Sequence, residues 1–437
     1  MNRHVLALLL RPGSGQRSLI ALPLIAFGVV TALVLTVIGG AQSFWTWTGE
    51  MAPIYQALAA IALVLLVVPL MSLGGAAARL SARRRDERLS TLRLLGVSPA
   101  GVTVATVIES VLLAGAGAAA GVLTYLAASP LIALIPFRGE ALGLAGVLLP
   151  PVQVVMVVAG VLLLAAASAV IGLRKVVISP LGVRMRSTVS TVHWIRAVIA
   201  VGVLATAYAL ISVFPSVAGF VTTVVVLAGL FAAAIAVLNL IGPWILRVAA
   251  TSQLRRAERP DRLLAARIVL DSPKAAWRQI GGIAMASFIA VFAGTGVSLM
   301  NVMGAAQAEA ELAADMRTGL IITLIGSFLM VAVSVGVNQA SDVLDQRDLH
   351  RSLHHLGMPL DTVDRARRRA IMSPLLITAI GSAVCAGVLV FPLMGLALIT
   401  APESLLTIVA VVTAGIVIVW LTTRATRPLL ARSFAPA

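Results

Sequence analysis

Charged residues are scarce in this chain: Asp, Glu, Lys and Arg make up 11% of its 437 residues, against roughly a quarter in soluble domains. Cysteine is nearly absent, and the single Cys385 leaves no disulfide framework and no thiolate metal site. No Ser/His/Asp set or metal-spaced cluster stands out. The phosphate-binding sequence GxxxxGKS or GxxxxGKT does not occur either. These absences argue against catalysis, a bound metal or a bound nucleotide in the chain itself.

Apolar residues dominate the composition, at 60% of the chain with a mean hydropathy of +1.04. Ten apolar runs reach about 20 residues, the length that spans the hydrocarbon core of a bilayer. The runs lie near residues 19–41, 54–80, 102–127, 151–173, 194–213, 217–246, 279–301, 319–341, 371–397 and 404–423. The sequence therefore predicts an all-α integral membrane protein with about ten transmembrane helices.

The basic residues are distributed unevenly between the loops. They gather in the N-terminal segment, in the loops after runs two, four, six and eight, and in the tail. Because cytoplasmic loops carry such an excess, we expect both termini in the cytoplasm. The net charge of +16 then lies beside the spans and meets membrane lipids, so we expect no nucleic-acid partner. The outer loops Gln42–Pro53 and Asn301–Thr318 are too short to fold as domains.

Two short charged segments, Ser81–Pro99 and Asp342–Pro359, interrupt the apolar runs. We expect a helix over 82–96 in the first and over 343–357 in the second. In the first helix Arg85, Arg88, Leu92 and Leu95 share one face, and Gly96 permits the left-handed exit that ends a helix. One such helix favours simple anchoring to anionic lipid. Two matched copies favour a docking surface for a cytoplasmic partner.

The two charged segments belong to an internal repeat with an offset of 261 positions (357 − 96). The offset relates Gly96 to Gly357, Pro12 to Pro273, Arg17 to Arg278, Phe27 to Phe288, Glu87 to Asp348, Leu92 to Leu353, Leu95 to Leu356 and Val102 to Val363. Each half reads as four spans around one charged helix, and two spans link the halves. We expect two parallel four-helix repeats, at 1–192 and 251–437, joined by linking spans at 193–250.

The sequence RRRDERLSTLRLLGVSP, followed by VATVIESVLL, resembles the permease module of FtsX-like (MacB-type) ABC transporters. That family shows a coupling helix with an acidic residue, a Leu-x-x-x-Gly ending and a glutamate early in the next span. Glu87, Leu92, Gly96 and Glu109 stand at these positions. The exit KVVISPLGVRMR also resembles the family. The second half keeps Asp348, Leu353 and Gly357 but has Ala370 in place of the glutamate.

The resemblance implies a transport subunit, not an enzyme, in a bacterial plasma membrane. Its coupling helices would dock a separate ATPase that binds ATP and Mg, with two copies per permease. Export or extraction of an amphiphile, such as a peptide antibiotic or a lipid, is the implied activity, or transmission of a mechanical signal. The family's large extracytoplasmic domain is lacking. The expected docking residues are Arg85, Glu87, Arg88, Leu92, Leu95, Gly96, Asp348, Leu353, Leu356 and Gly357.

Several polar residues lie within the apolar runs. Glu109 is an intramembrane candidate for function; the alternative is that it pairs with arginines at the cytoplasmic interface. Asn239, Asn338 and Gln339 are expected to form interhelical hydrogen bonds. Two other classes stay open: an ATPase-independent secondary transporter, which requires ion-pathway charges deep in the spans, and a regulatory membrane protein that docks a kinase or hydrolase.

Overall fold

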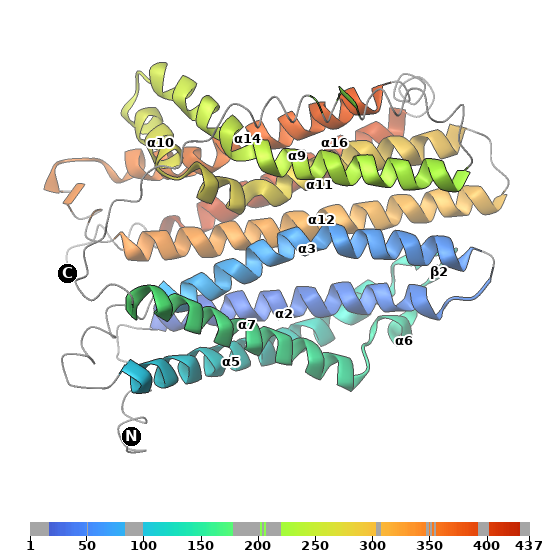
Figure 1. Ribbon diagram of the computed structural model, residues 1–437, viewed down its shortest axis with the longest axis horizontal. Helices are drawn as coiled ribbons and strands as arrows, with labels where there is room; N and C mark the ends of the chain where they lie inside the picture. Colours follow the sequence, from blue (N-terminus) through green and yellow to red (C-terminus); the bar gives the residue numbers. More distant parts are fainter. Residues whose placement is uncertain are drawn as a thin grey trace. The chain divides into compact units, whose positions relative to one another are not determined.

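The computed structural model describes residues 17–49, 51–83, 99–177, 202, 205–206, 220–302, 307–346, 349, 352–353, 355–391 and 402–428. These residues form two compact units. Unit 1 consists of residues from two ranges, Met1–Ser187 and Val333–Asp345. Unit 2 consists of residues from Thr188–Ala332 and Gln346–Ala437. Nearly all described elements are helices, drawn in Figure 1.

Six described stretches are long and apolar enough to cross a membrane: Pro23–Thr46, Val107–Ala133, Gly143–Val170, Pro273–Thr295, Glu311–Val343 and Leu360–Leu389. Two shorter apolar helices, Ala52–Leu66 and Val409–Ala425, accompany them. The protein is therefore an all-α membrane protein. Every predicted run except the one near 194–213 coincides with a described helix; that run lies almost wholly outside the described residues.

Unit 1 contains α2 (Arg17–Thr46), α3 (Ala52–Arg83), α5 (Pro99–Ala133) and α7 (Pro151–Val177), and successive helices run in opposite directions (Figure 1). Helix α2 packs on α3 and α5, and α7 packs on α3 and α5. Two glycines of α5 allow the closest approach. A Cβ added to Gly117 would lie 2.8 Å from the Leu24 carbonyl oxygen, and one at Gly121 would lie 2.7 Å from the Thr31 Cβ. Small residues thus let two membrane helices meet backbone to backbone.

The connection between α5 and α7 folds into a small cap. A hairpin pairs β1 (Pro136–Phe137) with β2 (Glu140–Ala141), and the short helix α6 (Gly143–Val147) follows. The Tyr125 hydroxyl, buried in α5, donates to the Val147 carbonyl oxygen at 2.8 Å and accepts the Leu149 N–H at 2.9 Å. Hydropathy alone did not predict this structure, because the cap is short and its residues mix polar and apolar types.

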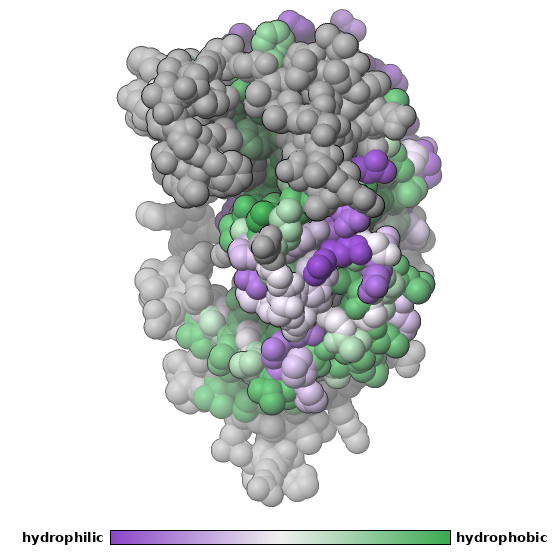
Figure 2. All heavy atoms as spheres, turned by 90° about the vertical axis from the view of Figure 1, so that its right-hand side faces the viewer, coloured by the Kyte–Doolittle hydropathy of each residue, from purple (hydrophilic) through white to green (hydrophobic). Residues whose placement is uncertain are grey.

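Aromatic side chains join the cap to the ends of α2 and α3. Phe44, Trp47, Tyr55 and Phe137 contact one another, with ring centroids 4.7–6.4 Å apart. The Arg138 guanidinium lies 5.5 Å from the Trp47 ring centroid. Figure 2 looks onto this end of the helices, where hydrophilic side chains lie beside hydrophobic ones. Such a mixture suits the boundary between membrane and water.

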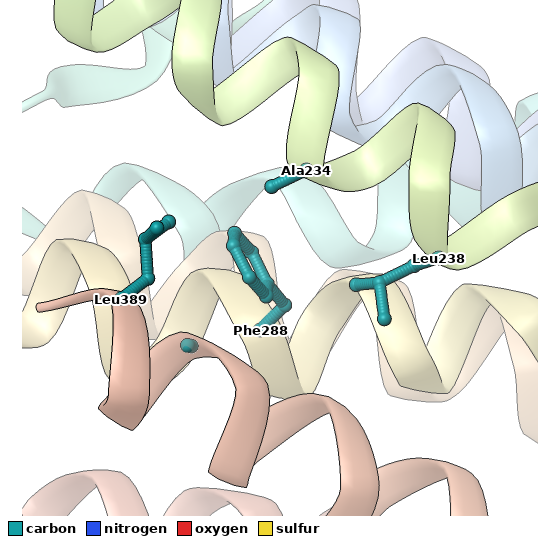
Figure 3. Packing of buried hydrophobic residues seen from close by; sticks show 5 residues of the cluster. Ala234, Leu238, Phe288 and Leu389 are labelled. Atoms are coloured by element: carbon teal, nitrogen blue, oxygen red, sulfur yellow. The ribbon is translucent and has the colours of Figure 1, made fainter. Parts of the chain in front are cut away.

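Unit 2 contains α9 (Phe220–Arg255), α10 (Pro260–Asp271), α11 (Pro273–Val302), α14 (Leu360–Leu389), α16 (Pro402–Ala425) and the first part of α12 (Gln307–Asp345). Helix α11 packs against α9, α14 and α16. Its fully buried Phe288 lies among Ala234 and Leu238 of α9 and Leu389 of α14 (Figure 3). The core of unit 2 is therefore organised around one apolar helix.

Polar side chains also join the helices of unit 2. Trp277 Nε1 of α11 donates to Asn239 Oδ1 of α9 at 2.9 Å, so Asn239 forms the predicted interhelical hydrogen bond. Gln253 Nε2 of α9 donates to Ser373 Oγ of α14 at 2.6 Å. Helix α14 begins at Leu360, eleven residues before the apolar run expected near 371–397. The helix extends past its apolar part because its polar first turns find ionic partners, described below.

Candidate docking site

The predicted docking residues fall into two groups. Arg85, Glu87, Arg88, Leu92, Leu95, Gly96 and Asp348 lie outside the described residues. Leu353, Leu356 and Gly357 are described, and they belong to the link between α12 and α14. Helix α12 continues through Asp345, so the first residues of the expected helix at 343–357 are the end of α12.

The link from α12 to α14 ends in a helical turn closed by Gly357. The Leu356 N–H donates to the Ser352 carbonyl oxygen at 3.1 Å, and the Met358 N–H donates to the Leu353 carbonyl oxygen at 3.0 Å. Gly357 has a φ of +82°, in the left-handed region that glycine tolerates best. This pattern is that of a helix ending at glycine.

Apolar side chains on this link project into solvent. Leu356 is 83% exposed and Leu349 is 53% exposed. His355, directly before Leu356, is exposed as well. Large aliphatic side chains on a short polar segment are the kind of surface that another protein can cover.

A cluster of ionic side chains lies directly after the link, in the first turns of α14. The Asp364 carboxylate is 1% exposed, and Arg368 Nη2 lies 2.9 Å from its Oδ2. Arg367 Nη2 lies 3.4 Å from Asp364 Oδ1 and also donates to Thr426 Oγ1 at 2.9 Å. A buried carboxylate requires such charged partners to offset its desolvation. Because Arg367 and Arg368 follow Asp364 by three and four residues, both of these ion pairs lie within α14.

Three further ionic contacts fasten α14 to its neighbours. Arg427, just after α16, lies 2.8 Å from Asp361 and 3.9 Å from Asp364. Arg369 Nη1 lies 2.6 Å from Oδ2 of the buried Asp261, in the first turn of α10. We name the set the arginine–aspartate cluster: Asp261, Asp361, Asp364, Arg259, Arg367, Arg368, Arg369 and Arg427. The cluster joins the ends of α10, α14 and α16 next to the exposed link.

This cluster was not predicted from the sequence. The basic residues of Arg365–Arg369 were expected in a loop, and no role was expected for Asp261 or Asp364. One signal was present: Asp364 precedes Arg367 and Arg368 by three and four residues, the spacing at which helical side chains meet. The partner residues Asp261 and Thr426 are too distant in the chain to infer from spacing.

Glu109 lies at the third position of the apolar stretch Val107–Ala133 in α5, and its side chain is partly exposed. It is thus near one end of the stretch, away from its middle. Within the part of the chain that the structure describes, no three His, Cys, Asp or Glu side chains group so that they could hold a metal ion.

Comparison with known proteins does not identify a family. No family model matches the chain, and no curated protein is significantly similar to it.

Proposed function

We propose that the protein is the membrane permease subunit of an ABC transporter of FtsX-like type. Separate ATPase subunits dock on its two charged segments, and it lies in a bacterial plasma membrane with both termini in the cytoplasm. The observation that carries the proposal is the link before α14, where Leu349 and Leu356 are exposed and a helical turn ends at Gly357. These leucines lie on a short turn only a few residues before the membrane helix α14. An apolar contact there would let a partner protein pass motion to that helix.

Burial at equivalent positions supports the duplicated architecture. Helices α5 and α14 begin at Pro99 and Leu360, which are 261 positions apart, the offset of the repeat. The related residues Phe27 and Phe288 are both fully buried. The same holds for Ala114 and Leu375. Helix α2 packs on α5 in unit 1, as α11 packs on α14 in unit 2. Two repeats of four spans, joined by linking spans, account for this agreement.

The arginine–aspartate cluster supports a route for the motion. When two ATPases close on ATP, they push on the link 346–359. Because Asp364, Asp261 and Arg427 fasten the start of α14 to α10 and α16, these three helix ends move together. The helices transmit the shift to their membrane-embedded parts. The substrate is an amphiphile, a peptide antibiotic or a lipid, drawn from the lipid-facing side; a mechanical signal across the membrane would use the same route.

Copy number in the purified complex tests the proposal. In mild detergent without nucleotide, we expect about two ATPase copies per chain, one for each repeat. Leu356→Asp should lower this to about one copy, Leu95→Asp should do the same, and the double variant should bind none. Leu144→Asp, which changes an exposed leucine of α6, is the matched control and should bind as wild type does. If no ATPase binds the wild-type protein, the proposal fails.

A further inference from the structure

Helix α10 lies at a membrane boundary. Only Ser272 separates it from α11, whose apolar stretch begins at Pro273. Ala265 and Val269 of α10 pack against Ala250 of α9 and Ala370 of α14. Ala250 follows the apolar run of α9, and Ala370 directly precedes that of α14. Figure 1 shows α10 beside the same ends of these helices. Helix α10 therefore lies beside the ends of apolar helices.

The two faces of α10 differ in composition. The face toward the protein carries Asp261, Ala265, Ala266 and Val269, all buried. Two large aliphatic side chains, Leu263 at 47% and Ile268 at 48% exposure, lie outside this buried set, about 140° apart around the helix. Two exposed arginines, Arg262 and Arg267, precede these aliphatic residues in the chain. Exposed aliphatic groups can reach acyl chains, while exposed arginines reach phosphates.

The surroundings of α10 are strongly basic. Between residues 255 and 278 the exposed basic residues are Arg255, Arg256, Arg259, Arg262, Arg267, Lys274 and Arg278. The exposed acidic ones are Glu258 and Asp271. The buried Asp261 is already paired with Arg369 and adds little to the outward charge. Such an excess of positive charge beside a membrane attracts anionic lipid headgroups.

We propose that the exposed surface of α10 is a binding site for anionic phospholipid of the adjoining leaflet. Arg262 and Arg267 bind the phosphates, and Leu263 and Ile268 insert among the acyl chains. Because Asp261 of α10 pairs with Arg369 of α14, the bound lipid also steadies the start of α14. This site does not depend on ATPase docking, so the two proposals stand or fall separately.

A lipid titration of the full-length protein tests the site. The protein is delipidated in detergent and titrated with phosphatidylglycerol or phosphatidylcholine, with binding read by native mass spectrometry and thermal stability. We expect wild type to prefer phosphatidylglycerol, and Arg262→Gln/Arg267→Gln to bind it about 30-fold more weakly, since each basic residue near a membrane surface strengthens binding about fivefold. Arg262→Lys/Arg267→Lys keeps the charge and should retain most of the affinity.

Two controls make the outcome decisive. Arg138→Gln/Arg317→Gln removes the same charge from exposed positions elsewhere and should bind as wild type does. Leu263→Ser/Ile268→Ser should weaken phosphatidylglycerol binding while leaving the response to inorganic phosphate unchanged. Equal binding of both lipids by wild type would overturn the proposal. So would full competition by inorganic phosphate, which would indicate a site for free anions, or undiminished binding by Arg262→Gln/Arg267→Gln.

Discussion

Arg369 of α14 and Asp261 of α10 form an ion pair between two helices, with Nη1 2.6 Å from Oδ2. The Asp261 side chain is almost fully buried, whereas Arg369 is partly exposed. The pair lies where α10 meets the start of α14, the helix that follows the proposed docking link. One contact thus connects the lipid-facing helix to the helix that would receive motion from a partner.

Two aspartates of α14, Asp364 and Asp361, differ in burial, and replacing each one tests how much the arginine–aspartate cluster stabilises unit 2. Asp364→Asn leaves Arg367 and Arg368 without their buried carboxylate, so we expect unit 2 to lose about 3 kcal/mol of stability. Asp361→Asn is the matched control, because Asp361 also pairs with Arg427 but its side chain is 61% exposed. The control should lose less than about 1 kcal/mol, as exposed ion pairs do. Thermal unfolding in detergent measures both, and equal losses would contradict the assigned role of Asp364.

The contact between α2 and α5 should tolerate no added side-chain volume at Gly121. A Cβ there would lie 2.7 Å from the Thr31 Cβ, so Gly121→Ala must separate the helices. We expect a clear fall in the unfolding temperature of unit 1, by the equivalent of about 1–3 kcal/mol for overpacking. Gly160→Ala in α7 meets nothing within 4 Å and should be neutral or slightly stabilising. A stable Gly121→Ala protein would show that the helices are not in close contact.

The cap of unit 1 depends on the Tyr125 hydroxyl. Tyr125→Phe removes its hydrogen bonds to Val147 and Leu149 and leaves buried backbone groups unpaired. Each such group costs about 1–3 kcal/mol, so residues 143–149 should exchange their amide hydrogens faster. The neighbouring Thr124 is exposed and donates only to Ala120 of its own helix. Thr124→Val should leave exchange in the cap unchanged, and unchanged exchange in Tyr125→Phe would refute this role.

The spans were the most predictable part of the fold. A segment in lipid must satisfy its backbone hydrogen bonds within a long helix of apolar residues, and such a segment is visible in the sequence as a long apolar run. Asn239 was predicted as an interhelical partner for the same reason and forms that hydrogen bond, whereas the buried Oε1 of Gln339, predicted in the same way, has no hydrogen-bond partner among the described residues. Gly357 could be predicted as a helix stop because glycine alone adopts its φ of +82° at little cost.

The polar ends of the helices were less predictable. Hydropathy marks where a helix enters lipid. It therefore does not detect the polar first turns of α14, which begins at Leu360. The hairpin was missed because its turn contains Arg138 at a φ of +54°, a conformation that local sequence rarely favours for arginine. The pairs of Arg369 with Asp261 and of Arg427 with Asp361 depend on tertiary packing. No local spacing rule detects contacts of that kind.

The most direct test of the proposed docking is photocrosslinking from the link itself in living cells. A benzophenone amino acid replaces Leu356, and a second protein carries it in place of Leu144 as the control. We predict a crosslink from position 356 to an ABC ATPase and none from position 144. The absence of an ATPase crosslink at 356, or equal crosslinking at both positions, would contradict the assignment of this protein as an ABC permease.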